Sequence, residues 1–522
     1  MDKVVKAPAR RLTGLIAVLA ATSIVMGCAA QAAPRADDVP GTAASAQPTP
    51  VGDTGASAAP SPAPVTANPP GAIKNVVLLL ADDLDATTFD QVRRLRQLHR
   101  QGLTLRNMVV TDSLCCPSRT SILRSQYVHN HGVVSNLQVS GGGWYTFDQK
   151  GEEKDCLPTW LHAAGITTGF VGKYLNGYGE DGDPTAIPPG WDRWFVPTTK
   201  SGMYRGYGYT VNDNGNLVTY GVNRKDFLND VMTKKAVNFI AQTDGPFYLQ
   251  VNSTAPHDPV PVADRHLGSH ANAKVPRTAA FNNRGENPPR WRSHKRVINN
   301  QRMARYDRYW RQRIQSSESF ADSVQAVTQA LRKKGVLDST LIIVTSDNGF
   351  HVASRRLPPG KRTPYREDTI VPAVVIGPGI TPGTRSNAMT STIDLGPTIA
   401  EVLGAQAPEF ADGRSLTPVL ANPASPSPWR TGVLSESLGE STFADPDYQT
   451  IKPPKFHALR TREWLYVEYE TGTRELYNRR SDPAELRNVV DSTDPAIVAS
   501  LSEHLAALVA CTGPTCRTAD TW

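Results

Sequence analysis

Short apolar runs followed at once by polar or ionisable residues recur along the chain. Val76 to Leu80 leads into Asp82-Asp83, Ile166 to Val171 into Lys173, Phe247 to Val251 towards His257, and Leu341 to Thr345 into Asp347-Asn348. Such runs of Val, Ile, Leu and Phe predict buried strands. Because sites form outside the carboxyl ends of parallel strands, we expect these acids, the lysine and the histidine at one edge of a sheet.

Helical patterns alternate with these runs, over Phe89 to Gln101, Cys156 to Ala164 and Phe320 to Lys334. The alternation is typical of an α/β domain, which we place at residues 71–425. After Leu420 a Pro- and Ser-rich segment precedes a strand-like run, Trp464 to Glu470, and a helical pattern, Pro495 to Val509. Residues 430–522 are therefore predicted to form a smaller α+β subdomain.

The first residues have the order of a secretion signal. Lys3, Lys6, Arg10 and Arg11 precede an apolar stretch from Leu12 to Met26, which is short for a membrane span. Val25-Met26-Gly27-Cys28 resembles a bacterial lipobox with Cys28 as the lipidated residue, and cleavage after Ala32 is the alternative. We expect a signal peptide over 1–32, an Ala-, Pro-, Ser- and Thr-rich linker over 33–70, and a bacterial protein that is secreted or anchored at the cell surface.

An exported protein meets oxidising conditions, so Cys511 and Cys516, which bracket Gly513-Pro514, are a candidate disulfide. The pattern does not decide whether Cys116 and Cys156 pair or stay as buried thiols.

The chain is basic, with a net charge of +7 and a pI near 9.0, which is compatible with an anionic substrate. The basic residues concentrate between Arg290 and Arg313. A solvated helix face explains this concentration most simply, and a contact for a sulfated polysaccharide is the alternative. No nucleic-acid-reading motif accompanies it, so we expect no nucleic acid partner.

Two acidic pairs end equivalent predicted strands. Asp82 and Asp83 carry like charges, which are costly side by side unless cations neutralise them, and Asp347-Asn348 adds two oxygen donors. An oxygen-only set suits Ca²⁺ or Mg²⁺ and suits zinc poorly. We therefore predict a divalent cation held by Asp82, Asp83, Asp347 and Asn348.

Cys115 opens the run Cys115-Cys116-Pro117-Ser118-Arg119. Pro117 suits the first turn of a helix that Ser118 to Gln126 can continue, so Cys115 is predicted just before the helix N-terminus. The unpaired N–H groups and positive partial charge at that end would stabilise an anion there.

This CxPSR run, NVVLLLADD over Asn75 to Asp83, Gly172-Lys173-Tyr174, Ala255-Pro256-His257, Ser346 to Gly349 and Gly360-Lys361-Arg362 occur in the order seen in sulfatases. Ile393 to Thr398 and Asp412 to Leu416 resemble later landmarks of the same family. The resemblance covers roughly residues 73–490. Tyr127 to Gly132, Gly172 to Gly177 and Pro189 to Trp191 resemble the N-acetylglucosamine-6-sulfatase branch most.

The resemblance implies an alkaline phosphatase-like α/β/α sandwich with a large mixed, mostly parallel sheet, plus an antiparallel sheet in the C-terminal subdomain. It implies that a formylglycine-generating enzyme oxidises Cys115 to formylglycine, the nucleophile that hydrolyses a sulfate monoester of an aryl group or an amino sugar. Calcium, more readily than magnesium, would bind the four donors together with the residue made from Cys115. Arg119 would hold the hydrated formylglycine, and Lys173, His257 and Lys361 would surround the sulfate.

Two departures from the family pattern qualify these expectations. Leu123-Arg124-Ser125-Gln126 replaces the usual leucine, threonine, glycine and basic residue, and Leu175 stands where a histidine is common. Asn176 and His351 are the candidate substrate contacts, with an ordinary structural role as the alternative for His351.

Two other functions stay open from the sequence. One is a phosphate or phosphonate ester hydrolase of the same superfamily, and the other is a surface protein that binds sulfated glycans without turnover. In each case we expect contact with a membrane only through a lipid anchor.

Overall fold

A computed structural model describes residues 73–427, 429–440, 443, 445, 447 and 452–522, which belong to one compact unit, Val65–Trp522. The expected signal segment with Cys28, and the expected linker over 33–70, lie outside the described residues. Among the helices that are described, none combines the length and the apolar character needed to cross a membrane.

The larger of two sheets contains eleven strands in the order β11-β2-β10-β8-β1-β7-β3-β4-β5-β6, with β9 paired to β2. The strands are β1 Asn75–Ala81, β2 Leu103–Val109, β3 Thr167–Gly172, β4 Arg193–Pro197, β5 Tyr209–Asp213, β6 Asn216–Tyr220, β7 Phe247–Asn252, β8 Thr340–Ser346, β9 Ile370–Val371, β10 Val374–Ile376 and β11 Arg385–Ser391. The centre, β8-β1-β7-β3-β4, is parallel, and antiparallel pairs flank it. The expected mixed, mostly parallel sheet is confirmed.

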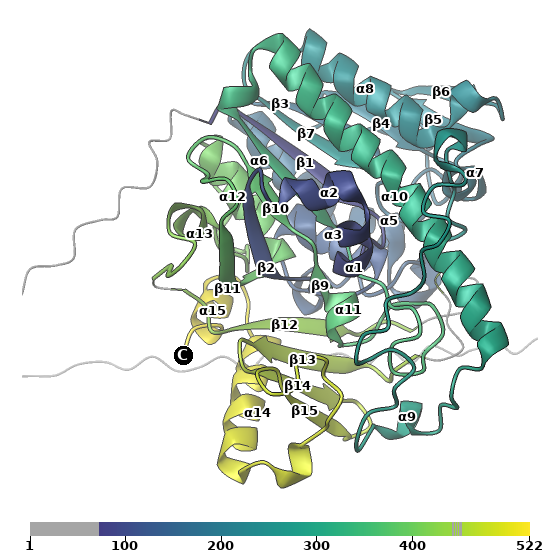
Figure 1. The fold of residues 1–522 in the computed structure, drawn as a ribbon. Coiled ribbons are helices and arrows are strands. Elements are labelled where there is room, and N and C mark those ends of the chain that lie inside the picture. Colours follow the sequence, from purple (N-terminus) through teal and green to yellow (C-terminus); the bar gives the residue numbers. More distant parts are fainter. Residues whose placement is uncertain (1–72, 428, 441–442, 444, 446, 448–451) are drawn as a thin grey trace, which may run out of the picture. The chain divides into compact units, whose positions relative to one another are not determined.

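Helices cover both faces of this sheet (Figure 1). Alternate residues of β1 point to opposite faces: Val77 and Leu79 pack in one core, Val76 and Leu78 in the other. The first core includes α1 Ala86–Gln91, α2 Arg93–Leu98, α8 Leu228–Gln242 and α10 Asn300–Lys334. The second includes α3 Cys115–Arg124, α5 Gly143–Gln149, α6 Leu157–Ala163 and α12 Leu395–Val402. β1 is apolar throughout because both its faces are buried.

The smaller sheet is an antiparallel meander of β12 Gly432–Ser437, β13 Phe456–Thr461, β14 Trp464–Tyr469 and β15 Arg474–Asn478. The helix α14, Pro495–Val509, packs on it through Leu501, Leu505 and Leu508. The remaining helices are short: α4 Val128–His131, α7 Lys200–Arg205, α9 Arg290–Ser293, α11 Arg366–Thr369, α13 Thr417–Ala421 and α15 Pro514–Ala519. The predicted strand near Trp464 and the helix over Pro495 to Val509 are both confirmed.

Two helix predictions need correction. The stretch Phe89 to Gln101 is not one helix, because Val92 takes an extended conformation that separates α1 from α2. The stretch Phe320 to Lys334 is only the second half of α10, which has 35 residues. The first turns of α10, residues 300–306, are exposed or half-buried, and the buried positions that follow are largely polar or charged, such as Arg313, Ser316 and Ser317, so this half gives little apolar periodicity.

Buried ion pairs tie the smaller sheet to the loop after β8. Arg460 on β13 and Arg355 both approach the carboxylate of Glu485, and all three side chains are almost fully buried. Burial alone would raise the pKa of Glu485, but the guanidinium groups outweigh it and lower the pKa to about 2 from the usual 4.5. A carboxyl group with a lowered folded pKa stabilises the fold above pH 4.5, and that contribution is lost as pH falls towards 2.

We therefore expect Glu485→Gln to lower the free energy of unfolding by a few kcal/mol near pH 7, because it leaves the buried guanidinium group of Arg460 without a counter-charge, whereas Arg355 keeps Glu367. The difference from the unmodified protein should shrink as pH falls below about 4.5. Urea unfolding of both proteins, near pH 7 and near pH 3, measures this difference in the free energy of unfolding. A difference that does not vary with pH would contradict the assigned ion pair.

Candidate active site

The residues predicted at strand ends meet at the carboxyl edge of the parallel strands. Ala81 pairs with Ser346 in the β1–β8 register, so Asp82 and Asp347 emerge side by side. Gly172 pairs with Asn252, so Lys173 emerges beside the loop that carries His257. Asp83 has a φ of 65°, a left-handed conformation that aspartate tolerates better than most residues, and its N–H donates to Asp347 Oδ1.

Cys115 is the first residue of α3, not the residue before it as the sequence predicted. Leu114 is extended and takes the N-cap position, and Pro117 lies in the first turn. Cys115 Sγ lies 3.3 Å from Asp82 Oδ1 and 3.8 Å from Asp83 Oδ1. The helix N-terminus thus places this side chain directly against the two aspartates, although burial and the Asp82 charge raise the pKa of the thiol well above its ordinary value.

The acidic residues form a set that fits a hard divalent cation. Ligand atoms of Asp82, Asp83, Cys115 and His257 all lie within 4.8 Å of one another. Asp83 Oδ2 and Asn348 Oδ1 are buried and accept no hydrogen bond from the described residues, so both keep free lone pairs. Asn348 also donates through Nδ2 to Asp83 Oδ1, at 2.7 Å. Buried oxygens without donors are what Ca²⁺ or Mg²⁺ requires.

Three buried cationic side chains surround the acids. Lys361 Nζ lies 2.8 Å from Cys115 Sγ and 2.6 Å from Asp83 Oδ1, and Lys173 Nζ lies 2.8 Å from Asp82 Oδ2. Arg119 Nε donates to Asp347 Oδ2 at 2.8 Å. Burial opposes the charge of both lysines, but the neighbouring carboxylates prevail and raise both pKa values well above the usual 10.5. Both lysines therefore stay protonated and can bind an oxyanion.

His257 completes the ring of cationic groups. Its Nδ1–H donates to the backbone carbonyl of Asp258 at 2.6 Å, and its ring stacks on Tyr204 at 4.2 Å between ring centres. Burial would lower the pKa of His257, but Asp82 and Asp447 outweigh it and raise the pKa to about 10. The imidazole is thus fixed in orientation and protonated at neutral pH.

Three residues of the site were missed by the sequence prediction. Asp447 Oδ1 lies 3.2 Å from His257 Nε2, and Asp447 Oδ2 lies 3.1 Å from Lys361 Nζ. Tyr204 stacks on His257, and Arg313 of α10 donates to the backbone carbonyl of Asp83. Each comes from a segment far away in the chain, and none belongs to a motif. Only the density of arginines around Arg313 was visible in the sequence.

Asn176 lies beside the catalytic cluster. It lines a small cavity of about 70 Å³ together with Lys173 and Tyr204, and its Oδ1 is buried without a hydrogen-bond partner among the described residues. The free oxygen leaves Asn176 able to accept a hydrogen bond from a ligand.

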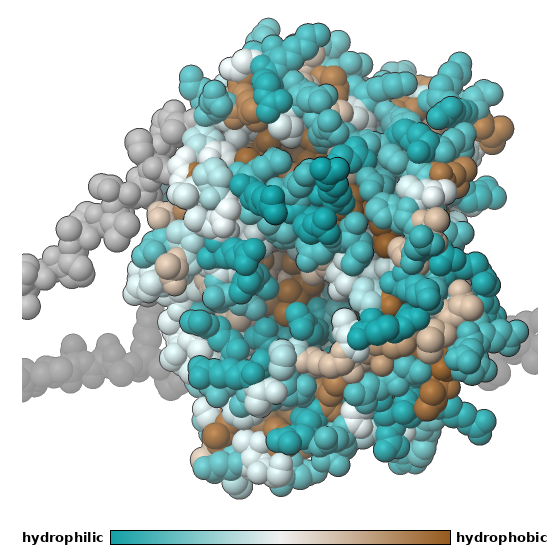
Figure 2. All heavy atoms as spheres, viewed as in Figure 1, coloured by the Kyte–Doolittle hydropathy of each residue, from teal (hydrophilic) through white to brown (hydrophobic). Residues whose placement is uncertain are grey.

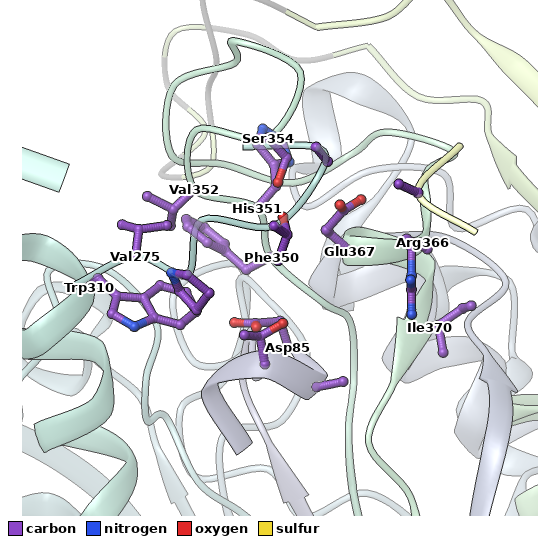
Figure 3. Close-up of a pocket in the computed structure, with 16 residues that line it drawn as sticks. Asp85, Val275, Trp310, Phe350, His351, Val352, Ser354, Arg366, Glu367 and Ile370 are labelled. Atoms are coloured by element: carbon purple, nitrogen blue, oxygen red, sulfur yellow. The ribbon is translucent and has the colours of Figure 1, made fainter. Parts of the chain in front are cut away.

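His351 lines a different cavity, of about 250 Å³, with Asp85, Trp310 and Phe350 (Figure 3). Its Nδ1 lies 2.9 Å from Asp368 Oδ1, and no hydrogen bond or ion pair among the described residues joins it to Cys115. The Asp368 carboxylate thus holds the His351 ring in place, which is the structural role considered as the alternative.

The altered segment after the core motif has a structural explanation. Ser125 ends α3 with a φ of 58°, in the left-handed conformation that a helix C-terminus commonly adopts. Glycine takes this conformation without strain. Ser125 here keeps the same turn at some conformational cost.

The cysteines outside the site that the structure describes are a disulfide pair and two thiols. Cys511 and Cys516 form a disulfide, and Cys116 and Cys156 are buried free cysteines.

A mostly parallel sheet between two helical layers, with acids and cationic side chains at its carboxyl edge, is typical of the alkaline phosphatase-like α/β/α class. The sulfatase family profile matches residues 74–405, and a profile described as "N-sulphoglucosamine sulphohydrolase, C-terminal" matches residues 360–510. The N-acetylglucosamine-6-sulfatase of Capra hircus is 34% identical over 484 residues, which cover 85% of this chain and 85% of that protein. The chain belongs to the sulfatase family, and it is a sulfuric ester hydrolase.

Solved structures share the fold at lower identity. One, in complex with its substrate D-glucosamine-2-N,6-O-disulfate, has a TM-score of 0.69 and 20% identity, covering 84% of this chain and 97% of that one. A phosphonate monoester hydrolase from Silicibacter pomeroyi has a TM-score of 0.62 and 22% identity, and the match covers 82% of this chain and 93% of that one. Sulfatases use formylglycine and a divalent cation. Cys115 is the residue at the formylglycine position, and it lies in a group with Asp82, Asp83 and His257 that could hold a metal ion.

Proposed function

We propose that this protein hydrolyses the sulfate ester of a sulfated amino sugar, with formylglycine made from Cys115 and with Ca²⁺ bound by Asp82, Asp83, Asp347 and Asn348. The observation that carries the proposal is the contact of Cys115 Sγ with both Asp82 and the Lys361 ammonium group, at 3.3 and 2.8 Å. The amino sugar is inferred from the 34% identity to an N-acetylglucosamine-6-sulfatase.

Formylglycine, as its hydrate, supplies one hydroxyl that attacks sulfur and a second whose deprotonation later expels sulfate. The divalent cation would neutralise the acids and polarise the sulfate oxygens. The chain's own residues do the rest. Arg119, fixed by Asp347, holds the nucleophilic residue beside Asp82. Lys361 is close enough to Cys115 Sγ to bind the hydroxyl or a sulfate oxygen there.

Charge grows on the bridging oxygen as the sulfur–oxygen bond breaks, and Lys173 and His257 can stabilise it. His257 is the proton donor that we propose, because its Nδ1 is committed to the Asp258 carbonyl and its Nε2 faces the acidic cluster. Tyr204 lies against both groups and excludes water from them. These donors are preorganised, so they need no rearrangement during the reaction.

We also propose that the chain is exported, with maturation of Cys115 by a formylglycine-generating enzyme. The basic-then-apolar start and the Val25 to Cys28 sequence support export and a lipid anchor. Growth with a radiolabelled fatty acid, comparing the unmodified protein with Cys28→Ala, tests the anchor. Label retained by Cys28→Ala would contradict it.

Phosphonate or phosphate ester hydrolysis is the second candidate, because a phosphonate monoester hydrolase shares the fold. The test compares 4-nitrophenyl sulfate, 4-nitrophenyl phosphate and a phenylphosphonate ester, and then glucosamine 6-sulfate with other sulfated sugars. We expect kcat/KM for the sulfate to exceed that for the phosphate by at least about 100-fold, or about 3 kcal/mol. A preference for the phosphorus esters would contradict the proposal, and saturable binding of sulfated sugars without turnover would identify a binding protein.

A further inference from the structure

Six exposed arginines between residues 284 and 308 form no ion pair with the acidic residues that the structure describes. They are Arg284, Arg290, Arg296, Arg302, Arg305 and Arg308, all of them exposed. We call this set the arginine strip. Nearby arginines are paired: Arg277 lies 2.9 Å from Asp307, and Arg265 lies 2.7 Å from Asp230. Among the described residues, none of the six takes part in an ion pair.

The strip is held in a defined place by buried anchors. Arg292, within the same segment, is fully buried and donates to the hydroxyl groups of Tyr365 and Tyr477. Arg356 donates to the backbone carbonyls of Asn282 and Lys295. Asn299 caps α10 through its side chain, which accepts from the N–H of Arg302. The loop before α10 is therefore tied down at several points, and its exposed guanidinium groups are carried on an ordered backbone.

The three strip members on α10, Arg302, Arg305 and Arg308, lie on the catalytic side of the sheet. The C-terminal end of α10 connects directly to β8, so it lies at the amino end of that strand. With 35 residues α10 is about 52 Å long, whereas the seven residues of β8 span about 23 Å. Its N-terminal part must therefore project beyond the carboxyl edge, as Figure 1 shows. Arg313 marks that edge by its bond to the Asp83 carbonyl, and residues 300–312 extend about 20 Å past it.

The composition of the strip points to an oxyanion ligand. Apart from Lys295, every lysine or arginine position of the segment 284–308 is an arginine, whose planar guanidinium group matches oxyanions with paired hydrogen bonds and is weakly hydrated. The segment 284–308 contains only Glu286 and Asp307 as acids, and Asp307 is bonded to Arg277. Strongly hydrophilic side chains cover the molecule around this end of α10 (Figure 2). A flexible polyanion could thus contact several guanidinium groups at once.

We propose that the arginine strip binds a sulfated polysaccharide chain while one of its sulfate esters occupies the catalytic site. This inference rests on the proposed function and extends it, because it assigns a polymer, not a free sugar, as the substrate. Several weak contacts along one chain raise the local concentration of the esters near Cys115. The small ester itself needs none of these contacts.

The test compares two triple variants that remove the same charge. Arg302→Gln/Arg305→Gln/Arg308→Gln changes the strip. Arg93→Gln/Arg100→Gln/Arg385→Gln is the matched control, because these three arginines are also exposed and line a basic cavity near the amino ends of β2 and β11. Each protein is assayed with 4-nitrophenyl sulfate, with sulfate release from heparin, and by elution from a heparin column with salt.

For the strip variant we expect 4-nitrophenyl sulfate turnover within about twofold of the unmodified protein, because surface changes rarely disturb a buried site. Its kcat/KM for heparin should fall at least tenfold, or about 1.4 kcal/mol, and it should elute at lower salt. The control should match the unmodified protein in all three assays. Equal losses in both variants, or no loss in the strip variant, would overturn the proposal.

Two further outcomes distinguish a failure of the strip proposal from a failure of the proposed function. If the unmodified protein hydrolyses no sulfate ester, the proposed function fails, and the heparin column still tests the strip. If the strip variant loses affinity for duplex DNA but keeps its affinity for heparin, the strip is a nucleic acid contact and the polysaccharide proposal is wrong.

Discussion

Replacement of Cys115 by alanine is expected to lower kcat for 4-nitrophenyl sulfate by at least about 10⁴-fold. The side chain lies at the first residue of α3, between Asp82 and the Lys361 ammonium group, where no other nucleophile is described. The neighbouring residues would then retain only electrostatic stabilisation and substrate binding, which leave a small residual rate when a nucleophile is removed.

The matched control is Cys116→Ala. Cys116 is also a buried free cysteine, but its side chain packs in the hydrophobic core beneath the site. Loss of the sulfur atom should cost some stability and leave kcat within a few-fold. Peptide mass spectrometry of the unmodified protein should show an aldehyde or its hydrate at Cys115. Full activity with an unmodified thiol at Cys115 would refute the mechanism.

Replacement of Asp83 by asparagine is expected to abolish tight Ca²⁺ binding and to lower kcat about 10³-fold. Asp83 Oδ2 is buried and accepts no hydrogen bond from the part of the chain that the structure describes, and Oδ1 accepts from both Lys361 and Asn348. Asparagine removes the charge that the proposed Ca²⁺ and Lys361 would both need, at nearly constant shape. Removal of divalent cations with a chelator from the unmodified protein should cause a similar loss, which Ca²⁺ should reverse more completely than Mg²⁺.

Asp85→Asn is the control for this change. Asp85 lies two residues further on and is also buried, but its carboxylate caps α1 through Thr88 and approaches Arg313. Asparagine is a good N-cap and keeps an oxygen for Arg313, so the protein should fold with some loss of stability, because Arg313 loses its counter-charge, and with Ca²⁺ binding retained. Calorimetric titration with Ca²⁺ measures both variants independently of turnover. Equal Ca²⁺ affinity in Asp83→Asn and the unmodified protein would exclude Asp83 as a ligand.

The strands that build the site were predictable because their signal is local. β1, β3, β7 and β8 are buried on both faces, so each reads as an apolar run that ends in polar residues. The helix over Pro495 to Val509 was equally visible, since it begins with Asp494 as N-cap and proline in the first turn. In the first half of α10 the first turns are exposed and many of the buried positions after them are polar or charged, so the apolar pattern is weak there and the start of the helix was missed.

The amino-acid sequence by itself determined the central parallel strands, the position of the polar residues after them, and the Cys115 to Arg119 run that indicates formylglycine chemistry. Each of these features can be recognised from a few consecutive residues of the chain. Only the tertiary structure decided that Asp447 reaches His257 and Lys361, that Tyr204 stacks on His257, and that Arg313 bonds the Asp83 carbonyl. Those contacts join segments more than fifty residues apart, and their partners are chosen by packing across the whole fold, which no local pattern encodes.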